Sequence, residues 1–132
     1  MPEAKTQVVQ VSDSAAEGTA RNHSVFIDRP EAKGGSDKGP MGGEYFLMGL
    51  GGCFMSNLLA AIKAREADVK NVSIEITGSM AGEPTRFSAV NLNISAEYSD
   101  KDLMTKLVTI AERGCLVANT VKNAVDLSFT IN

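Results

Sequence analysis

The sequence predicts an α+β fold in which antiparallel strands surround one long central helix. Three observations support this class. Segments with alternating apolar residues precede and follow residues 44–67, the segment 44–67 carries almost no charge before Lys63, and two further helical segments lead into a last strand. Because the 132 residues contain no repeat and no long linker, we expect a single domain spanning 1–132.

The N-terminal part of the chain predicts a hairpin followed by an irregular loop. Residues 5–12 alternate weakly around a pair of valines, and residues 19–30 place Val25 and Ile27 two positions apart. Pro30 ends the second strand because proline has no backbone donor for the sheet. Glycine and proline are dense in residues 31–43, which predicts an ordered loop without regular structure.

Residues 44–67 predict a helix that is apolar on every side and must therefore be covered on every side. A membrane span is the alternative, since the apolar part has about the minimum length that crosses a bilayer. Glycines together with Ser56 and Asn57 dilute the hydrophobicity, which favours a core helix and no membrane partner. The glycines also favour close approach of a second such helix, as in a homodimer.

The C-terminal half predicts a second hairpin, a helix pair and a strand. Residues 69–80 alternate apolar and polar side chains, and residues 85–98 supply the antiparallel partner. Ser99 with Asp102 three positions later predicts the start of a helix over 100–114, which Gly114 ends. A second helical start follows at 115–125, and residues 125–132 form the last strand.

Composition excludes several function classes. The 13 basic residues are outnumbered by 16 acidic ones and are scattered, so no nucleic-acid partner is expected. A polar N-terminus without a signal-peptide pattern predicts a cytoplasmic protein. The one histidine, His23, and two cysteines cannot furnish a closed zinc site, so no metal is expected. The glycine-rich loop lacks the P-loop and dinucleotide patterns, and no cofactor is expected.

The two cysteines are the candidates for chemistry. Cys53 lies in the middle of the apolar helix, and Cys115 lies at the predicted first turn of the last helix, where N–H groups and the helix dipole favour a thiolate. Free cysteine also packs as a small hydrophobic residue, so a structural role is the alternative for each. If the sulfurs meet, one thiol can attack an oxidant and the other can form a disulfide with it. Their spacing alone does not show that they meet.

Several motifs, in this order, resemble the OsmC/Ohr family of organic hydroperoxide reductases. In chain order, these motifs are R-x-H at Arg21–His23, DRPEAKGGSDKGP at 28–40, Glu44 nine residues before the first cysteine, LGGC at 50–53 and CLVANT at 115–120. The resemblance covers most of the chain. The sequence departs from the usual family pattern in three places. Gly42 and Gly43 lie where the family usually has a proline between GP and the glutamate, and Leu116 lies where a proline commonly follows the second cysteine. Arg21 is also closer in sequence to Glu44 than the catalytic arginine is in the best-studied branch of the family.

The resemblance implies an intertwined homodimer with an OsmC/Ohr-like fold, its two long helices buried centrally and its active sites at the subunit interface. It also implies a thiol-dependent peroxidase for oxidative stress defence, with organic hydroperoxides as substrates and a dithiol reductant. Cys53 would be the peroxidatic thiolate and Cys115 the resolving thiol. Arg21 would stabilise the thiolate, and Glu44 would hold the guanidinium by parallel hydrogen bonds.

Apolar side chains of the helix would then favour organic peroxides over hydrogen peroxide. The predicted substrate contacts are Phe46, Leu50, Phe54 and Met55, with His23 as a pocket wall. Simpler roles remain open: a solvated strand residue for Arg21 or His23, and a favourable charge at a helix N-terminus for Glu44. The alternative function is a non-catalytic OsmC-like dimer that binds a small apolar or electrophilic ligand.

Overall fold

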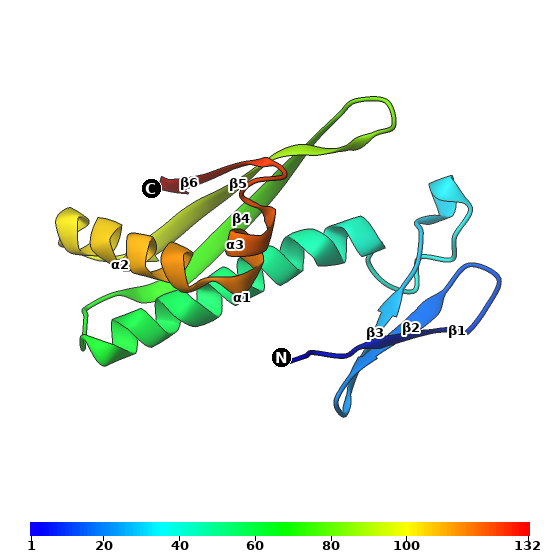
Figure 1. The fold of residues 1–132 in the computed structure, drawn as a ribbon, viewed down its shortest axis with the longest axis horizontal. Helices are drawn as coiled ribbons and strands as arrows, with labels where there is room; N and C mark the ends of the chain where they lie inside the picture. The colour runs from blue at the N-terminus through cyan, green and yellow to red at the C-terminus, as the bar shows by residue number, and fades with distance from the viewer. The chain divides into compact units, whose positions relative to one another are not determined.

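The computed structural model describes all residues 1–132, which divide into two compact units, Met1–Phe46 and Leu47–Asn132 (Figure 1). The first unit holds a three-stranded sheet and a loop. The second holds another three-stranded sheet and the C-terminal helices, and the long helix begins in the first unit and continues into the second. The α+β class with two sheets and a long helix is therefore as predicted.

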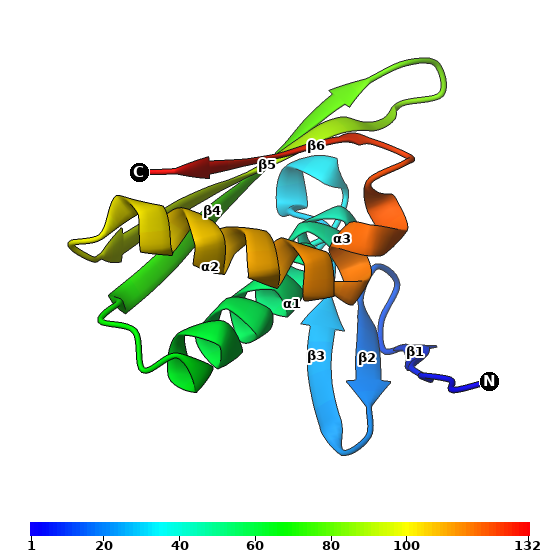
Figure 2. The ribbon, with the colours of Figure 1, turned by 60° about the vertical axis from the view of Figure 1, so that its left-hand side comes forward.

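The first sheet contains three antiparallel strands in the order β1 (Gln7–Gln10), β2 (Ala16–Ala20) and β3 (His23–Ile27). A single strand over 19–30 was the prediction, and this is wrong. Ala20 pairs with His23, so the chain reverses between them, and Arg21 adopts the left-handed region with φ 57°. Figure 2 shows β2 and β3 as this tight hairpin. No glycine marks the turn, which is why the pattern of apolar residues did not reveal it.

The loop after β3 is held by the carboxylate of Asp28, whose side chain is only 3% exposed. Its oxygens accept the backbone N–H groups of Arg29 at 2.7 Å and of Ser36 and Lys38 at 3.2 Å. Gly39 passes so close to β3 that a Cβ on it would lie 2.2 Å from the Phe26 carbonyl oxygen. The loop is thus ordered, as predicted, and contains one short 3-10 turn at Glu31–Lys33.

The long helix α1 spans Gly42–Ala64 and agrees with the prediction of a helix at 44–67. By length and composition alone α1 is also able to cross a membrane. Five of its residues are buried within the protein: Leu50, Gly51, Phe54, Leu58 and Ala61. Core helices of globular proteins have the same length and composition, and these buried positions face the core described below.

The second sheet has the strand order β4 (Lys70–Ala81), β5 (Arg86–Glu97) and β6 (Asp126–Ile131). Strands β4 and β5 form the predicted antiparallel hairpin. Strand β6 instead pairs with β5 in parallel, a direction that the expectation of antiparallel sheets did not include. The parallel pairing arises because α2 and α3 carry the chain back along the sheet before β6 begins, as Figures 1 and 2 show.

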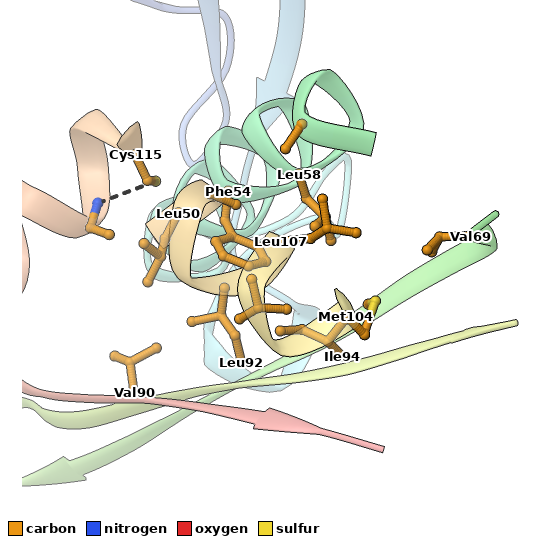
Figure 3. Close-up of a cluster of buried hydrophobic side chains, with 14 of the residues drawn as sticks. Leu50, Phe54, Leu58, Val69, Val90, Leu92, Ile94, Met104, Leu107 and Cys115 are labelled. Carbon is orange, nitrogen blue, oxygen red and sulfur yellow. Dashed lines mark hydrogen bonds between the residues drawn. The ribbon is translucent and has the colours of Figure 1, made fainter. Parts of the chain in front are cut away.

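Two helices connect β5 to β6: α2 (Lys101–Gly114) and α3 (Leu116–Val121). Asp100 caps α2 by accepting the Leu103 N–H at 3.0 Å, so the predicted start at Ser99 is one residue early. Buried side chains of α1, α2 and β5 meet in one core, shown in Figure 3. Phe54 of α1 packs on Phe129 of β6 with ring centroids 5.0 Å apart, which joins the helix to the sheet.

Candidate active site

The two cysteines come from different elements of the second unit. Cys53 lies near the middle of α1 and is half-buried. Cys115 is 0% exposed and stands between α2 and α3, where its sulfur caps α3 by accepting the Ala118 N–H at 3.4 Å (Figure 3). The predicted position of Cys115 at the start of the last helix is confirmed. Both are free thiols.

The sulfur of Cys53 lies within hydrogen-bonding reach of the Cys115 thiol, which donates to it. The backbone N–H groups of Val117 and Leu116, in the first turn of α3, donate to the same sulfur. Burial by itself raises the pKa of Cys53, but these three donors outweigh it and hold the pKa below its ordinary value. The site therefore favours the thiolate at Cys53.

Cys115 has the opposite preference. Burial raises the pKa of its thiol, and the neighbouring Cys53 raises it further both by accepting its proton in a hydrogen bond and by its charge. The Ala118 and Val117 N–H groups lower the pKa of Cys115 without reversing this. The thiol that ionises more readily thus lies beside one that holds its proton, an arrangement suited to attack on an oxidant followed by disulfide formation.

The corner between α2 and α3 is braced where it approaches α1. The Asn57 amide donates to the Cys53 carbonyl oxygen at 3.0 Å, and a Cβ on Gly114 would lie 3.3 Å from the Asn57 Oδ1. Asn119 donates its backbone N–H to the Cys115 carbonyl at 2.9 Å and its side-chain amide to the Arg113 carbonyl at 3.1 Å. These contacts hold the chain on either side of Cys115.

The other predicted polar residues belong to the first unit. The Glu44 carboxylate accepts the Met41 N–H at 2.8 Å, so it caps the start of α1 while remaining exposed. Arg21 is exposed at the β2–β3 turn. His23 begins β3 and lines an apolar groove of about 280 Å³ on that sheet, together with Val8, Val25 and Tyr45. The predicted roles of Arg21, Glu44 and His23 stay predictions.

The predicted apolar contacts differ in what they can offer a substrate. Leu50 and Phe54 are 0% exposed and lie in the core, so in this chain they have no free surface. Phe46 is exposed and Met55 is half-buried, so both keep accessible surface. No group of three or more His, Cys, Asp and Glu side chains is placed to hold a metal ion.

Several groups in the site were not predicted from the sequence. The N–H donors of Leu116 and Val117 are backbone atoms, and their side chains give no signal for them. Asn57 follows Cys53 by one helical turn, a spacing that places both on one face and could have been noticed. The side chain of Leu116 is 72% exposed beside the buried Cys115, which composition alone does not reveal.

Comparisons with known proteins assign the chain to a family. The family model described as OsmC-like protein matches residues 35–130, which include both cysteines. No curated protein matches this chain in a sequence search.

Solved structures have the same fold. A Psychrobacter arcticus protein described as an osmotic stress induced and detoxification response protein is 19% identical, with a TM-score of 0.85 and coverage of 100% of this chain and 98% of that one. An OsmC-like protein of unknown function from Vibrio cholerae is 15% identical, with a TM-score of 0.85 and full coverage of both chains. The organic hydroperoxide resistance protein OhrB of Bacillus subtilis is 20% identical, with a TM-score of 0.72 and 98% coverage of each. The family match and the shared fold together lead to one conclusion: the chain belongs to the OsmC/Ohr family of OsmC-like proteins.

Proposed function

We propose that this chain is a thiol-dependent peroxidase that reduces organic hydroperoxides to alcohols in oxidative stress defence. The observation that supports it most is the placement of Cys53, whose pKa is lowered, beside Cys115, whose pKa is raised. Some solved structures with this fold are described as organic hydroperoxide resistance proteins. We further propose that residues 1–132 form a single OsmC-like domain and that the protein is cytoplasmic.

The reaction balances with a dithiol as the reductant. The Cys53 thiolate attacks the distal oxygen of the hydroperoxide, the O–O bond breaks, and the alkoxide leaves with a proton as the alcohol. The sulfenic acid formed on Cys53 then reacts with the Cys115 thiol, forming the S–S bond and releasing water. The dithiol reductant reduces this disulfide and is itself oxidised, which restores both thiols.

The other predicted residues have proposed roles in this scheme. Arg21 orients the peroxide and stabilises the thiolate, and Glu44 holds the guanidinium. Glu44 is suited to that role because only one of its carboxylate oxygens accepts the Met41 N–H. Phe46 and Met55 offer the accessible apolar surface for an organic substituent, and His23 is the proposed pocket wall. Leu50 and Phe54 support that surface from the core rather than touching the substrate.

The exposed side of α1 supports the proposal of a homodimer. Phe46, Met48 and Leu59 are large apolar residues that remain exposed on this helix. A Cβ added at Gly49 or Gly52 would meet no other atom within 4 Å, so this side of α1 is open to another backbone. Such a surface on a long apolar helix is suited to a second copy of the same helix.

A second candidate function is a non-catalytic dimer that binds a small apolar or electrophilic ligand. The groove on the first sheet favours it, because the surface that its lining residues expose is mainly apolar. Under this alternative the cysteines serve packing or regulation, which is consistent with the complete burial of Cys115.

Variants of the two cysteines distinguish these functions. In a turnover assay with an organic hydroperoxide and a dithiol, Cys53→Ser is expected to abolish reduction while the protein stays folded. When the dithiol is left out, Cys115→Ser is expected to undergo one stoichiometric oxidation per site, because the sulfenic acid forms on Cys53 but has no resolving thiol. Turnover that persists in Cys53→Ser would rule out Cys53 as the peroxidatic thiol, whereas a natural chain without turnover would leave the binding function.

A further inference from the structure

Gly114 ends α2 immediately before Cys115, and its backbone conformation does not require glycine. The residue belongs to the helix, and its φ is not among the positive values found at Gly34 and Gly82. In a helix, alanine is favoured over glycine by about 1 kcal/mol. The conformation of the chain therefore gives no reason for glycine at position 114.

The reason lies in the contact with α1. A Cβ on Gly114 would lie 3.3 Å from the Asn57 Oδ1 and 3.8 Å from its Cγ. The amide cannot simply turn away, because its nitrogen donates to the Cys53 carbonyl oxygen at 3.0 Å. A methyl group at position 114 must displace either this amide or the α2–α3 corner.

The corner itself resists local adjustment. Asn119 binds the carbonyls on both sides of Gly114, those of Arg113 and Cys115, and the Cys115 N–H donates to the Glu112 carbonyl at 3.2 Å. A displacement of Gly114 therefore also displaces Cys115. The sulfur of Cys115 must approach Cys53 still more closely to form a disulfide. The same amide fills the space beside Gly114 on one side and binds the backbone of Cys53 on the other.

We propose that Asn57 and Gly114 are positioning residues that set the approach of Cys115 to Cys53 and thereby govern closure of the disulfide. The inference rests on the proposed function in its use of the Cys53–Cys115 pair. It extends that function by naming a spacer, formed by one amide and one missing methyl group, that adjusts the reduction potential of the pair.

The test measures the thiol–disulfide equilibrium of the full chain with mixtures of reduced and oxidised glutathione, without any peroxide. Each exchange transfers two electrons and two protons from the protein dithiol to the oxidised reagent. The fraction of disulfide is read by alkylation and intact mass. Gly114→Ala is expected to lower the equilibrium constant for the protein disulfide by about tenfold, while thermal unfolding shows the reduced variant to be as stable as the natural chain.

A double variant and a matched glycine complete the design. Asn57→Ala removes the amide, so adding Gly114→Ala to it is expected to leave the equilibrium constant of Asn57→Ala unchanged. Gly42→Ala adds the same methyl group where no atom lies within 4 Å, and is expected to have no effect. The proposal is overturned if the equilibrium constant of Gly114→Ala equals that of the natural chain. It is also overturned if adding Gly114→Ala to Asn57→Ala still lowers the equilibrium constant.

The result separates this inference from the proposed function. A natural chain that forms the disulfide with oxidised glutathione but does not reduce peroxides contradicts the peroxidase alone, and the spacer is still tested. A natural chain that forms no disulfide with the reagent contradicts both. A natural chain that reduces peroxides and forms the disulfide as readily as Gly114→Ala contradicts only the spacer.

Discussion

Cys115 donates its thiol hydrogen bond to the sulfur of Cys53 while its own sulfur caps α3. The two cysteines are 62 positions apart in number (115 − 53) but adjacent in space because α1 and the α2–α3 corner pack in one core. The donor stabilises the thiolate that would attack a peroxide, and it is the same thiol that would resolve the product. One contact thus serves the first two steps of the proposed reaction.

The hydrogen bond from Cys115 can be tested with two substitutions at that position. Serine keeps an O–H donor and is a preferred N-cap, whereas alanine has no donor. In both variants Cys53 is the only thiol, so the pH dependence of its alkylation gives its pKa directly. We expect a higher pKa for Cys53 in Cys115→Ala than in Cys115→Ser. Coincident pH profiles would show that the donor does not stabilise the thiolate.

The backbone donor of Leu116 can be removed without breaking α3. Leu116 is the first residue of that helix, where proline is favoured, and Cys115 before it already has an extended backbone with φ −81° and ψ 112° that tolerates a following proline. Leu116→Pro is expected to raise the pKa of Cys53 and to slow its alkylation at neutral pH. Leu116→Ala is the matched control because it loses the same side chain but keeps the N–H. Equal rates in the two variants would exclude the N–H as a stabilising group.

If the dimer forms through the exposed side of α1, a larger side chain there is expected to weaken dimer formation without unfolding the subunit. Gly49→Leu has room in the single chain and improves helix propensity, so the subunit is expected to stay folded. Light scattering after size-exclusion chromatography should show a shift from dimer to monomer. Thr105→Leu, on the exposed side of α2, is the control and should stay dimeric. A natural chain that is monomeric at every concentration would contradict the dimer.

Because of the Asp28 carboxylate, the free energy of unfolding of the first unit is expected to change with pH in the acid range. Its burial raises its pKa, but the Lys38, Arg29 and Ser36 N–H groups and the Ser14 hydroxyl outweigh this and hold the pKa below its ordinary value. Because the pKa is lowered in the folded state, the ionised carboxylate stabilises the fold at pH values above its ordinary pKa of about 4. This stabilisation is lost as the pH falls through the folded-state pKa. Denaturant unfolding between about pH 5 and 2 should therefore lose stability more steeply in the natural chain than in Asp28→Asn. Asp37→Asn, in the same loop but exposed, should keep the steep dependence.

The elements that sequence patterns predicted best are those with strong periodicity. The helix at Gly42–Ala64 and the hairpin of β4 and β5 follow from runs of apolar residues with regular spacing. The turn at Arg21 was missed because it lacks glycine, and the parallel pairing of β6 was missed because strand direction is set by the path of the connecting helices. Local patterns do not contain either kind of information.

The candidate site was predictable only in part for the same reason. The sequence indicated two cysteines and a helix N-terminus at Cys115, and the structure adds that the Cys115 thiol lies within hydrogen-bonding reach of Cys53. The N–H donors and the contact between Asn57 and Gly114 arise from packing between α1 and the α2–α3 corner. Such contacts depend on tertiary structure, so no spacing in the sequence marks them.

The most direct test of the peroxidase follows the free thiols and the intact mass of the reduced protein after addition of cumene hydroperoxide or, separately, of hydrogen peroxide. The account predicts rapid loss of both thiols of each chain with a mass decrease of about 2 Da, the mass of two hydrogens, and a faster reaction with the organic peroxide. Slow or absent oxidation by both peroxides would contradict the account.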